Sequence, residues 1–169
     1  TTLVACSGGE CSNTSASLRV NEPKELVFDD GSAEDFGDIG DTRGFIAARL
    51  TPDTYPANLN IARFSIFDQT PYPFDLRVWD DNRGGGTPGT DLMTPRIVNP
   101  VAPSVPNQEV AWFDINLSTE NIVITSGDFY VGWRQLDLVE RNQVGFDTDT
   151  PLLLRTWGYL SGLGWFNLN

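Results

Sequence analysis

The segment 127–133, which reads GDFYVGW, constrains the fold more than any other part of the chain. Successive side chains of a β-strand point to opposite faces. An extended conformation would therefore place Phe129, Val131 and Trp133 on one face and Tyr130 and Arg134 on the other. Three large apolar side chains on a single face predict a strand that covers a hydrophobic core.

Short apolar segments of this kind recur along the chain, separated by Pro, Gly and Asp. The sequence has 169 residues with 16 glycines, 11 prolines and 11% aromatic residues, which is typical of one domain made of many short strands. We expect an all-β fold: a two-sheet, mostly antiparallel, jelly-roll-like β-sandwich. The expected strands are residues 25–29, 43–50, 58–67, 74–80, 91–98, 109–115, 121–124, 127–134, 143–147, 152–157 and 163–168.

The expected core lies between the two sheets, where large aromatic side chains usually fill the space. Within residues 58–67 the apolar positions change parity, which predicts a β-bulge near Ala62 or Arg63. Trp112 is expected in the core as well. The other expected core residues are Phe64, Ile66, Val78, Phe113, Phe129, Val131 and Trp133.

The N-terminal 23 residues differ in composition from the rest. They contain a short apolar segment, two cysteines and a polar run, and we interpret residues 1–23 as an N-terminal extension and residues 24–169 as the sandwich domain. No apolar run approaches the roughly 18 residues of a membrane span, so we expect no membrane crossing.

The charge and the missing histidine exclude several classes of function. The formal net charge is −12, so the phosphate backbone of a nucleic acid would be repelled. The chain has no histidine, which removes the common Ser/His/Asp, Cys/His and zinc-dependent catalytic systems. A pair of carboxylates would still suffice to hydrolyse a glycoside, but no acidic residue stands in a distinguishing motif. We therefore expect a protein that is not an enzyme.

Cys6 and Cys11 enclose the sequence SGGE. Two glycines in a four-residue connection allow the chain to fold back, and an oxidising exterior would favour a disulfide between the two cysteines. The alternative is a lipid anchor, because residues 3–6, LVAC, match the pattern of a bacterial lipobox. The chain retains residues that a lipoprotein peptidase would remove, so we favour the disulfide. Both interpretations predict a secreted or cell-surface protein.

An acidic loop covers residues 29–41. Carboxylates at short spacing, with glycines that permit sharp turns, are the ligands that calcium prefers. The alternative is a solvated acidic turn, because the loop lacks the last glutamate of a helix-flanked calcium site. The candidate Ca²⁺ ligands are Asp29, Asp30, Glu34, Asp35, Asp38 and Asp41.

The sequence also contains candidate sites for glycan binding and for N-glycosylation. Trp79 alternates with the apolar positions of its strand and is expected to point away from them, so Trp79 and Trp157 are candidates for exposed stacking on a glycan. Asn13 and Asn116 each begin an Asn-X-Ser/Thr sequon, the acceptor pattern for N-glycosylation.

The order of these segments resembles a known family. From residue 25 the sequences ELVFDDGSAE, FDLRVWDD, WFDINL, GDFYVGW and GFDTDTP are similar to a jelly-roll accessory domain found in secreted bacterial and archaeal surface proteins and peptidases. The resemblance covers about six-sevenths of the chain and implies a non-catalytic β-sandwich without assigned functional residues. Such domains usually continue beyond the position of WFNL into another strand, which is missing from this sequence.

A sandwich that lacks a strand exposes an unpaired sheet edge, which invites another chain. The β-prone segment formed by Thr1, Thr2, Leu3, Val4 and Ala5 is a candidate to fill that edge in a neighbouring copy. We therefore expect an extracellular structural module that self-assembles by strand exchange into a filament or adhesive subunit. Alternatively, this segment pairs within its own sandwich, or the chain was trimmed from a longer parent protein. The alternative function is a glycan-binding accessory domain of a larger secreted enzyme, and a carboxylate-pair hydrolase is the third class.

Overall fold

A computed structural model of the chain describes residues 5–7, 10–12, 23–26, 35–67, 71–101, 110–146 and 154–168. Within these residues all the elements are β-strands and there is no helix. Every recorded strand pair is antiparallel. The predicted all-β, antiparallel fold class is therefore confirmed.

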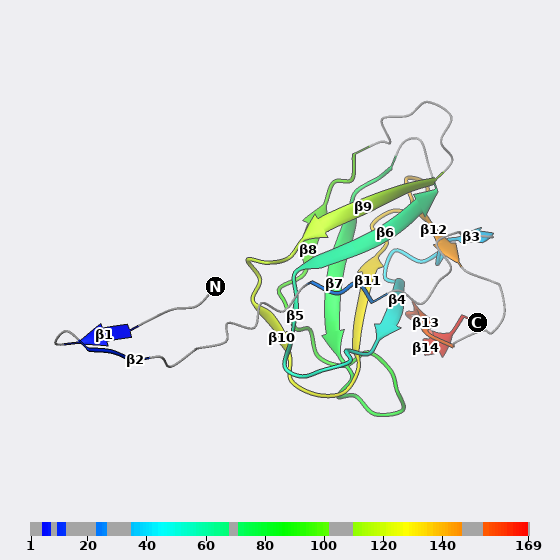
Figure 1. Ribbon diagram of the computed structural model, residues 1–169. Coiled ribbons are helices and arrows are strands. Elements are labelled where there is room, and N and C mark those ends of the chain that lie inside the picture. Colours follow the sequence, from blue (N-terminus) through cyan, green and yellow to red (C-terminus); the bar gives the residue numbers. More distant parts are fainter. Residues whose placement is uncertain are drawn as a thin grey trace.

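Two sheets form the body of the molecule, and in Figure 1 strands β6 and β9 of one sheet lie in front of strands β7 and β11 of the other. The six-stranded sheet has the order β14 (Gly164–Asn167), β13 (Thr156–Leu160), β4 (Phe45–Leu50), β11 (Phe129–Arg134), β7 (Phe74–Asp80) and β8 (Arg96–Val98). The four-stranded sheet has the order β3 (Asp35–Gly37), β12 (Gln143–Phe146), β6 (Ile61–Phe67) and β9 (Val110–Asn116).

Two small sheets complete the fold. Strand β5 (Ala57–Leu59) pairs with β10 (Ile122–Ile124) beside the sandwich, and β1 (Ala5–Ser7) pairs with β2 (Glu10–Ser12) in the N-terminal segment. The predicted division into residues 1–23 and 24–169 stays a prediction.

The main core lies between the two large sheets, and β11 supplies its centre. Phe129, Val131 and Trp133 all point into this core, as their alternation predicted. Trp133 packs its ring at 5.6 Å from Phe64 of β6 and at 4.9 Å from Phe74 of β7. These contacts join the two sheets, so β11 and β6 face each other across the sandwich. The predicted core residues Phe64, Ile66, Val78, Phe129, Val131 and Trp133 are buried, and Phe113 is half-buried against them.

The parity change in residues 58–67 has a different cause from the one expected. No single bulged strand is formed, because the chain leaves β5 at Leu59 and enters β6 at Ile61. Strand β5 pairs with β10, whereas β6 pairs with β9, and the Asn60 carbonyl at the junction accepts a hydrogen bond of 2.7 Å from the Leu117 N–H. The predicted bulge near Ala62 or Arg63 is therefore wrong, since a change of partner strand resets the alternation.

Strand β9 faces the core with the side opposite to the one that carries Trp112. Phe113 and Ile115 pack inward, and Trp112 is 48% exposed. Adjacent residues of a strand cannot share a face. Phe113 is opposite Phe64 in the register of β9 with β6, so Phe113 takes the inward position and the prediction of a core Trp112 is wrong.

Candidate functional site

The outer face of the six-stranded sheet carries a second cluster of aromatic side chains. Ala47, Trp79 and Tyr130 are buried there, and Phe45, Trp157 and Trp165 pack against them. The strand register explains this grouping, because it places these residues, together with Tyr159, on the face opposite to the main core. The sheet therefore buries apolar side chains on both of its faces.

This second cluster shows that the sheet is strongly curled. Trp79 on β7 and Trp165 on β14 are four strand positions apart, which would be about 19 Å in a flat sheet. Their ring centroids nevertheless lie only 5.6 Å apart, with the ring planes at 82°. Phe45 of β4 stacks at 5.8 Å from Trp165 as well. The outer face is therefore concave, and the β13–β14 hairpin folds over it.

The curl overturns one prediction about glycan stacking. Trp79 does point away from the main core, as predicted, but it is only 5% exposed because Trp165 and Phe45 cover it. An exposed stacking position at Trp79 is therefore wrong. Trp157 is half-buried, and its Nε1 has no hydrogen-bond partner among the described residues. Stacking of a glycan on Trp157 stays a prediction.

Charged side chains next to the aromatic cluster form ion pairs with one another. Asp75 is buried and forms ion pairs with Arg77 at 3.2 Å and with Arg134 at 3.1 Å. Arg77 also pairs with Asp91 at 3.2 Å and lies 5.3 Å above the ring of Phe45. Burying a carboxyl group is costly unless it has such partners. These four charged side chains therefore have a structural role beside the second aromatic cluster.

Strand β14 forms one edge of the six-stranded sheet, and within the described part of the chain no strand pairs with its outer side. The Leu168 N–H donates to the Thr156 carbonyl at 2.9 Å, and the register places Trp165 opposite Tyr159. Hydrogen-bonded and non-hydrogen-bonded pairs alternate in an antiparallel ladder. The backbone N–H and C=O of Trp165 are therefore directed outward from the sheet edge.

The surroundings of β14 are apolar. Leu163 is 69% exposed in the turn before the strand, and Leu168, just after it, and Leu154 are exposed too. The strand itself reads GWFN, without the lysine, proline or inward charge that commonly protects a sheet edge. Within the described residues no strand covers this edge. The family resemblance placed a missing strand after this segment, whereas the alternation of side chains alone did not distinguish it from the other expected strands.

The candidate calcium ligands fall into two groups. Asp29, Asp30 and Glu34 lie outside the described residues. Asp41 accepts hydrogen bonds from the N–H groups of Arg43 and Ser161, and these bonds lower its pKa to about 2.

The two other described acids of this group have protein partners too. Asp38 pairs with Arg141 at 3.1 Å, and Asp35 accepts a hydrogen bond from the N–H of Phe36. Within the described residues no group of three or more acidic or cysteine side chains is arranged to hold a metal. Calcium binding by the whole loop stays a prediction.

Two other predicted sites are placed only in part. Cys6 and Cys11 are directly opposite each other in the β1–β2 ladder, and their disulfide stays a prediction. Asn116 is exposed at the end of β9, and its Oδ1 accepts hydrogen bonds from the N–H and the hydroxyl of Ser118, the third residue of the sequon. Residues 1–4 and Asn13 lie outside the described residues.

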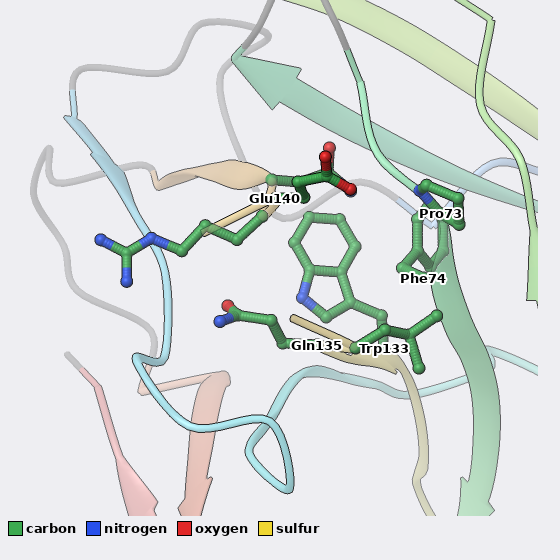
Figure 2. Close-up of a pocket in the computed structure, with 8 residues that line it drawn as sticks. Pro73, Phe74, Trp133, Gln135 and Glu140 are labelled. Atoms are coloured by element: carbon green, nitrogen blue, oxygen red, sulfur yellow. The ribbon is translucent and has the colours of Figure 1, made fainter. Parts of the chain in front are cut away.

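A small hollow lies beside the main core, and in its lining the Trp133 indole lies between Gln135 and Phe74 (Figure 2). Its volume is about 10 Å³, which is room for about one water molecule. Gln135 is one of the lining residues, and its Oε1 is buried without a hydrogen-bond partner among the described residues. The lining residues are Pro73, Phe74, Trp133, Gln135, Leu136, Glu140, Arg141 and Asn142.

No helix within the described residues is long and apolar enough to cross a lipid bilayer. A scan of protein-family models, a search of curated proteins and a search of solved structures each returned no match to this chain.

Proposed function

We propose that this protein is a non-catalytic structural module of the cell exterior that assembles with further copies of itself by strand addition. The acceptor is the outer edge of β14, and the donor is the segment 1–5 of a neighbouring copy. The observation that carries the proposal is the outward-facing backbone of Trp165 on an edge strand surrounded by exposed leucines.

The chemistry of both partners fits this pairing. An added strand would pair with the outward N–H and C=O groups of Trp165, and its apolar side chains would cover Leu163 and Leu168. In an extended donor, Leu3 and Ala5 fall on one face. Ordering each donor residue costs about 1–2 kcal/mol of backbone entropy, so the ladder bonds and the apolar burial are both needed to hold the segment.

The N-terminal hairpin is compatible with this role. Ala5 pairs with Ser12 in the β1–β2 ladder, which occupies one of the two hydrogen-bonding edges of β1. The other hydrogen-bonding edge of β1 remains available for pairing with a strand of a neighbouring copy. Because donor and acceptor are different parts of the surface, the contact is head-to-tail, and contacts of this type that do not close into a ring grow into filaments.

Photo-crosslinking tests the pairing directly. A benzophenone amino acid replaces Leu3, the protein is concentrated and irradiated, and the crosslinked peptides are identified by mass spectrometry. We expect crosslinks between subunits to residues 163–168. The matched control places the same amino acid at Ile97, an exposed residue on β8 at the opposite edge of the same sheet, and should give no crosslink to β14.

Assembly is then measured by sedimentation velocity and electron microscopy. Deletion of residues 1–5, or the double substitution Leu163→Lys and Leu168→Lys, should leave monomers, whereas Ile97→Lys with Val101→Lys should still assemble. The proposal is wrong if the truncated protein forms the same polymer, or if the full-length protein remains a compact monomer at high concentration.

A further inference from the structure

The outer face of the four-stranded sheet carries an aromatic ring that neither core uses. Trp112 is 48% exposed, whereas Trp79 and Trp133 are buried and Trp157 and Trp165 are half-buried. In the register of β9 with β6, Trp112 is opposite Ser65. This sheet is on the opposite side of the molecule's main core from the second aromatic cluster. Trp112 therefore belongs to a separate surface.

A row of side chains crosses this face from Trp112. In the antiparallel pairing of β12 with β6, Gln143 is opposite Phe67 and Val144 is opposite Ile66. Continuing this register by one residue places Gly145 opposite Ser65. Gly145 is in turn opposite Phe36 of β3. The row thus has an aromatic ring at each end and two of the smallest residues between them. At about 4.8 Å per strand, the Cα atoms of Trp112 and Phe36 are about 14 Å apart.

The floor of this row contains a hydroxyl group with unused hydrogen-bonding capacity. Ser65 is only 7% exposed, and its Oγ has no hydrogen-bond partner among the described residues. Buried polar atoms normally have a partner. The Ser65 hydroxyl is covered, so a ligand on this face would meet Trp112 and the exposed polar groups beside it.

A donor and an acceptor lie next to Trp112 on the same face. The next cross-strand pair on this face is Arg63 with Asp114, joined by two hydrogen bonds of 2.6 and 3.0 Å. Arg63 also donates to Glu25 at 2.8 Å. This pairing lowers the pKa of Asp114, chiefly through the hydrogen bond from Arg63. Both side chains remain about half exposed, so each can make a further hydrogen bond.

We infer that this face binds a neutral glycan, with Trp112 stacked against the apolar face of one pyranose ring and the Arg63–Asp114 pair bonded to its hydroxyls. A sugar hydroxyl both donates and accepts, so a mixed Arg–Asp pair matches it better than a single charge would. The indole supplies a flat apolar surface with a polar border, which suits the same ring.

The charges on this face favour a neutral ligand. Asp114, Glu25 and the net charge of −12 disfavour an anionic polymer. A stable protein partner would need a larger continuous apolar patch. Among the residues whose side chains the structure describes, Ile61 is another exposed apolar residue on this face of β6, and the charged Arg63–Asp114 pair lies between it and Trp112. Glycan binding here is independent of strand addition, because β14 belongs to the other sheet.

Fluorescence titration and acrylamide quenching test the inference on the full-length protein, with cellohexaose, xylohexaose and mannohexaose as probes. We expect at least one probe to bind with a Kd on the order of 0.1–1 mM and to protect tryptophan from acrylamide. Trp112→Ala should weaken binding about tenfold or more, which corresponds to about 1.4 kcal/mol. Trp112→Tyr should retain part of it, and Arg63→Gln and Asp114→Asn should each weaken it several-fold.

The control variant Trp157→Phe changes a half-buried tryptophan on the other sheet and should bind like the unchanged protein. Thermal melts verify that Trp112→Ala remains folded, as expected for an exposed side chain. The inference is overturned if none of the three probes binds, if Trp157→Phe weakens binding as much as Trp112→Ala, or if only anionic polygalacturonate binds. It is also overturned if Trp112→Ala abolishes self-association while no probe binds, because the face would then be a contact between copies.

Discussion

The substitution Gly132→Ala tests the close approach of β4 and β11, the two central strands of the six-stranded sheet. A Cβ atom at position 132 would lie 2.1 Å from the Ile46 carbonyl oxygen and 2.7 Å from the Ala47 Cα. Both are backbone atoms of β4, which is held between β11 and β13. The clash cannot be relieved by turning a flexible side chain, so one of the paired strands must move.

The expected cost follows from this geometry. Overpacking a well-packed site usually costs about 1–3 kcal/mol, and a contact with fixed backbone places Gly132→Ala at or above about 3 kcal/mol. For a chain of this length that corresponds to a fall in Tm of roughly 6–12 °C. Gly162→Ala is the matched control, since nothing lies within 4 Å of a Cβ built there, and it should change stability by less than about 0.5 kcal/mol.

Urea unfolding followed by circular dichroism measures both free energies of unfolding. The slope of the unfolding free energy against urea concentration should be unchanged, which would show that each variant exposes the same surface area when it unfolds. If Gly132→Ala costs less than about 1 kcal/mol, or no more than Gly162→Ala, the close approach of β4 and β11 does not restrict the side chain at position 132.

Two further predictions concern the acidic loop. Because Asp41 has a pKa of about 2, below its ordinary 3.8, its contribution to stability is complete above pH 3.8 and is lost as the pH falls towards 2. Thermal melts should therefore show Asp41→Asn less stable than the unchanged protein at pH 7, with the difference shrinking between pH 4 and pH 2, and a constant difference would contradict this. If the acidic loop binds calcium, added Ca²⁺ should raise Tm and a chelator should reverse the rise, whereas identical melts in calcium and in chelator would reject a calcium site.

The alternation of side chains was sufficient to predict the strands that build the main core. Phe129, Val131 and Trp133 repeat with a period of two, and no other regular structure places all three on one face. The same rule failed in 58–67, because it assumes that a strand keeps its partner. Here β5 and β6 have different partners, and the change occurs at Asn60.

The surfaces could not be predicted from alternation alone. Strand β9 carries Trp112 and Phe113 side by side, and the pattern requires one of them to face outward without saying which. Register with β6 decides, by placing Phe113 opposite Phe64. The cover over Trp79 depends on Trp165, which approaches only because the sheet curls, and no local pattern encodes that curvature. The edge position of β14 among the described strands depends on strand order, which is a property of the whole sheet.

The β13–β14 hairpin is fastened to the molecule by partners that are very distant along the chain. Asp41 accepts from the Ser161 N–H across a separation of 120 residues, and Arg43 bonds the Ser161 hydroxyl across 118. Contacts of such high sequence separation form slowly, because the loop must be closed before they contribute. The hairpin should therefore dock late in folding, after β4, β11 and β7 have paired. Until then Trp79 and Tyr130 remain open to solvent, and this interval is when the chain is most exposed to premature aggregation.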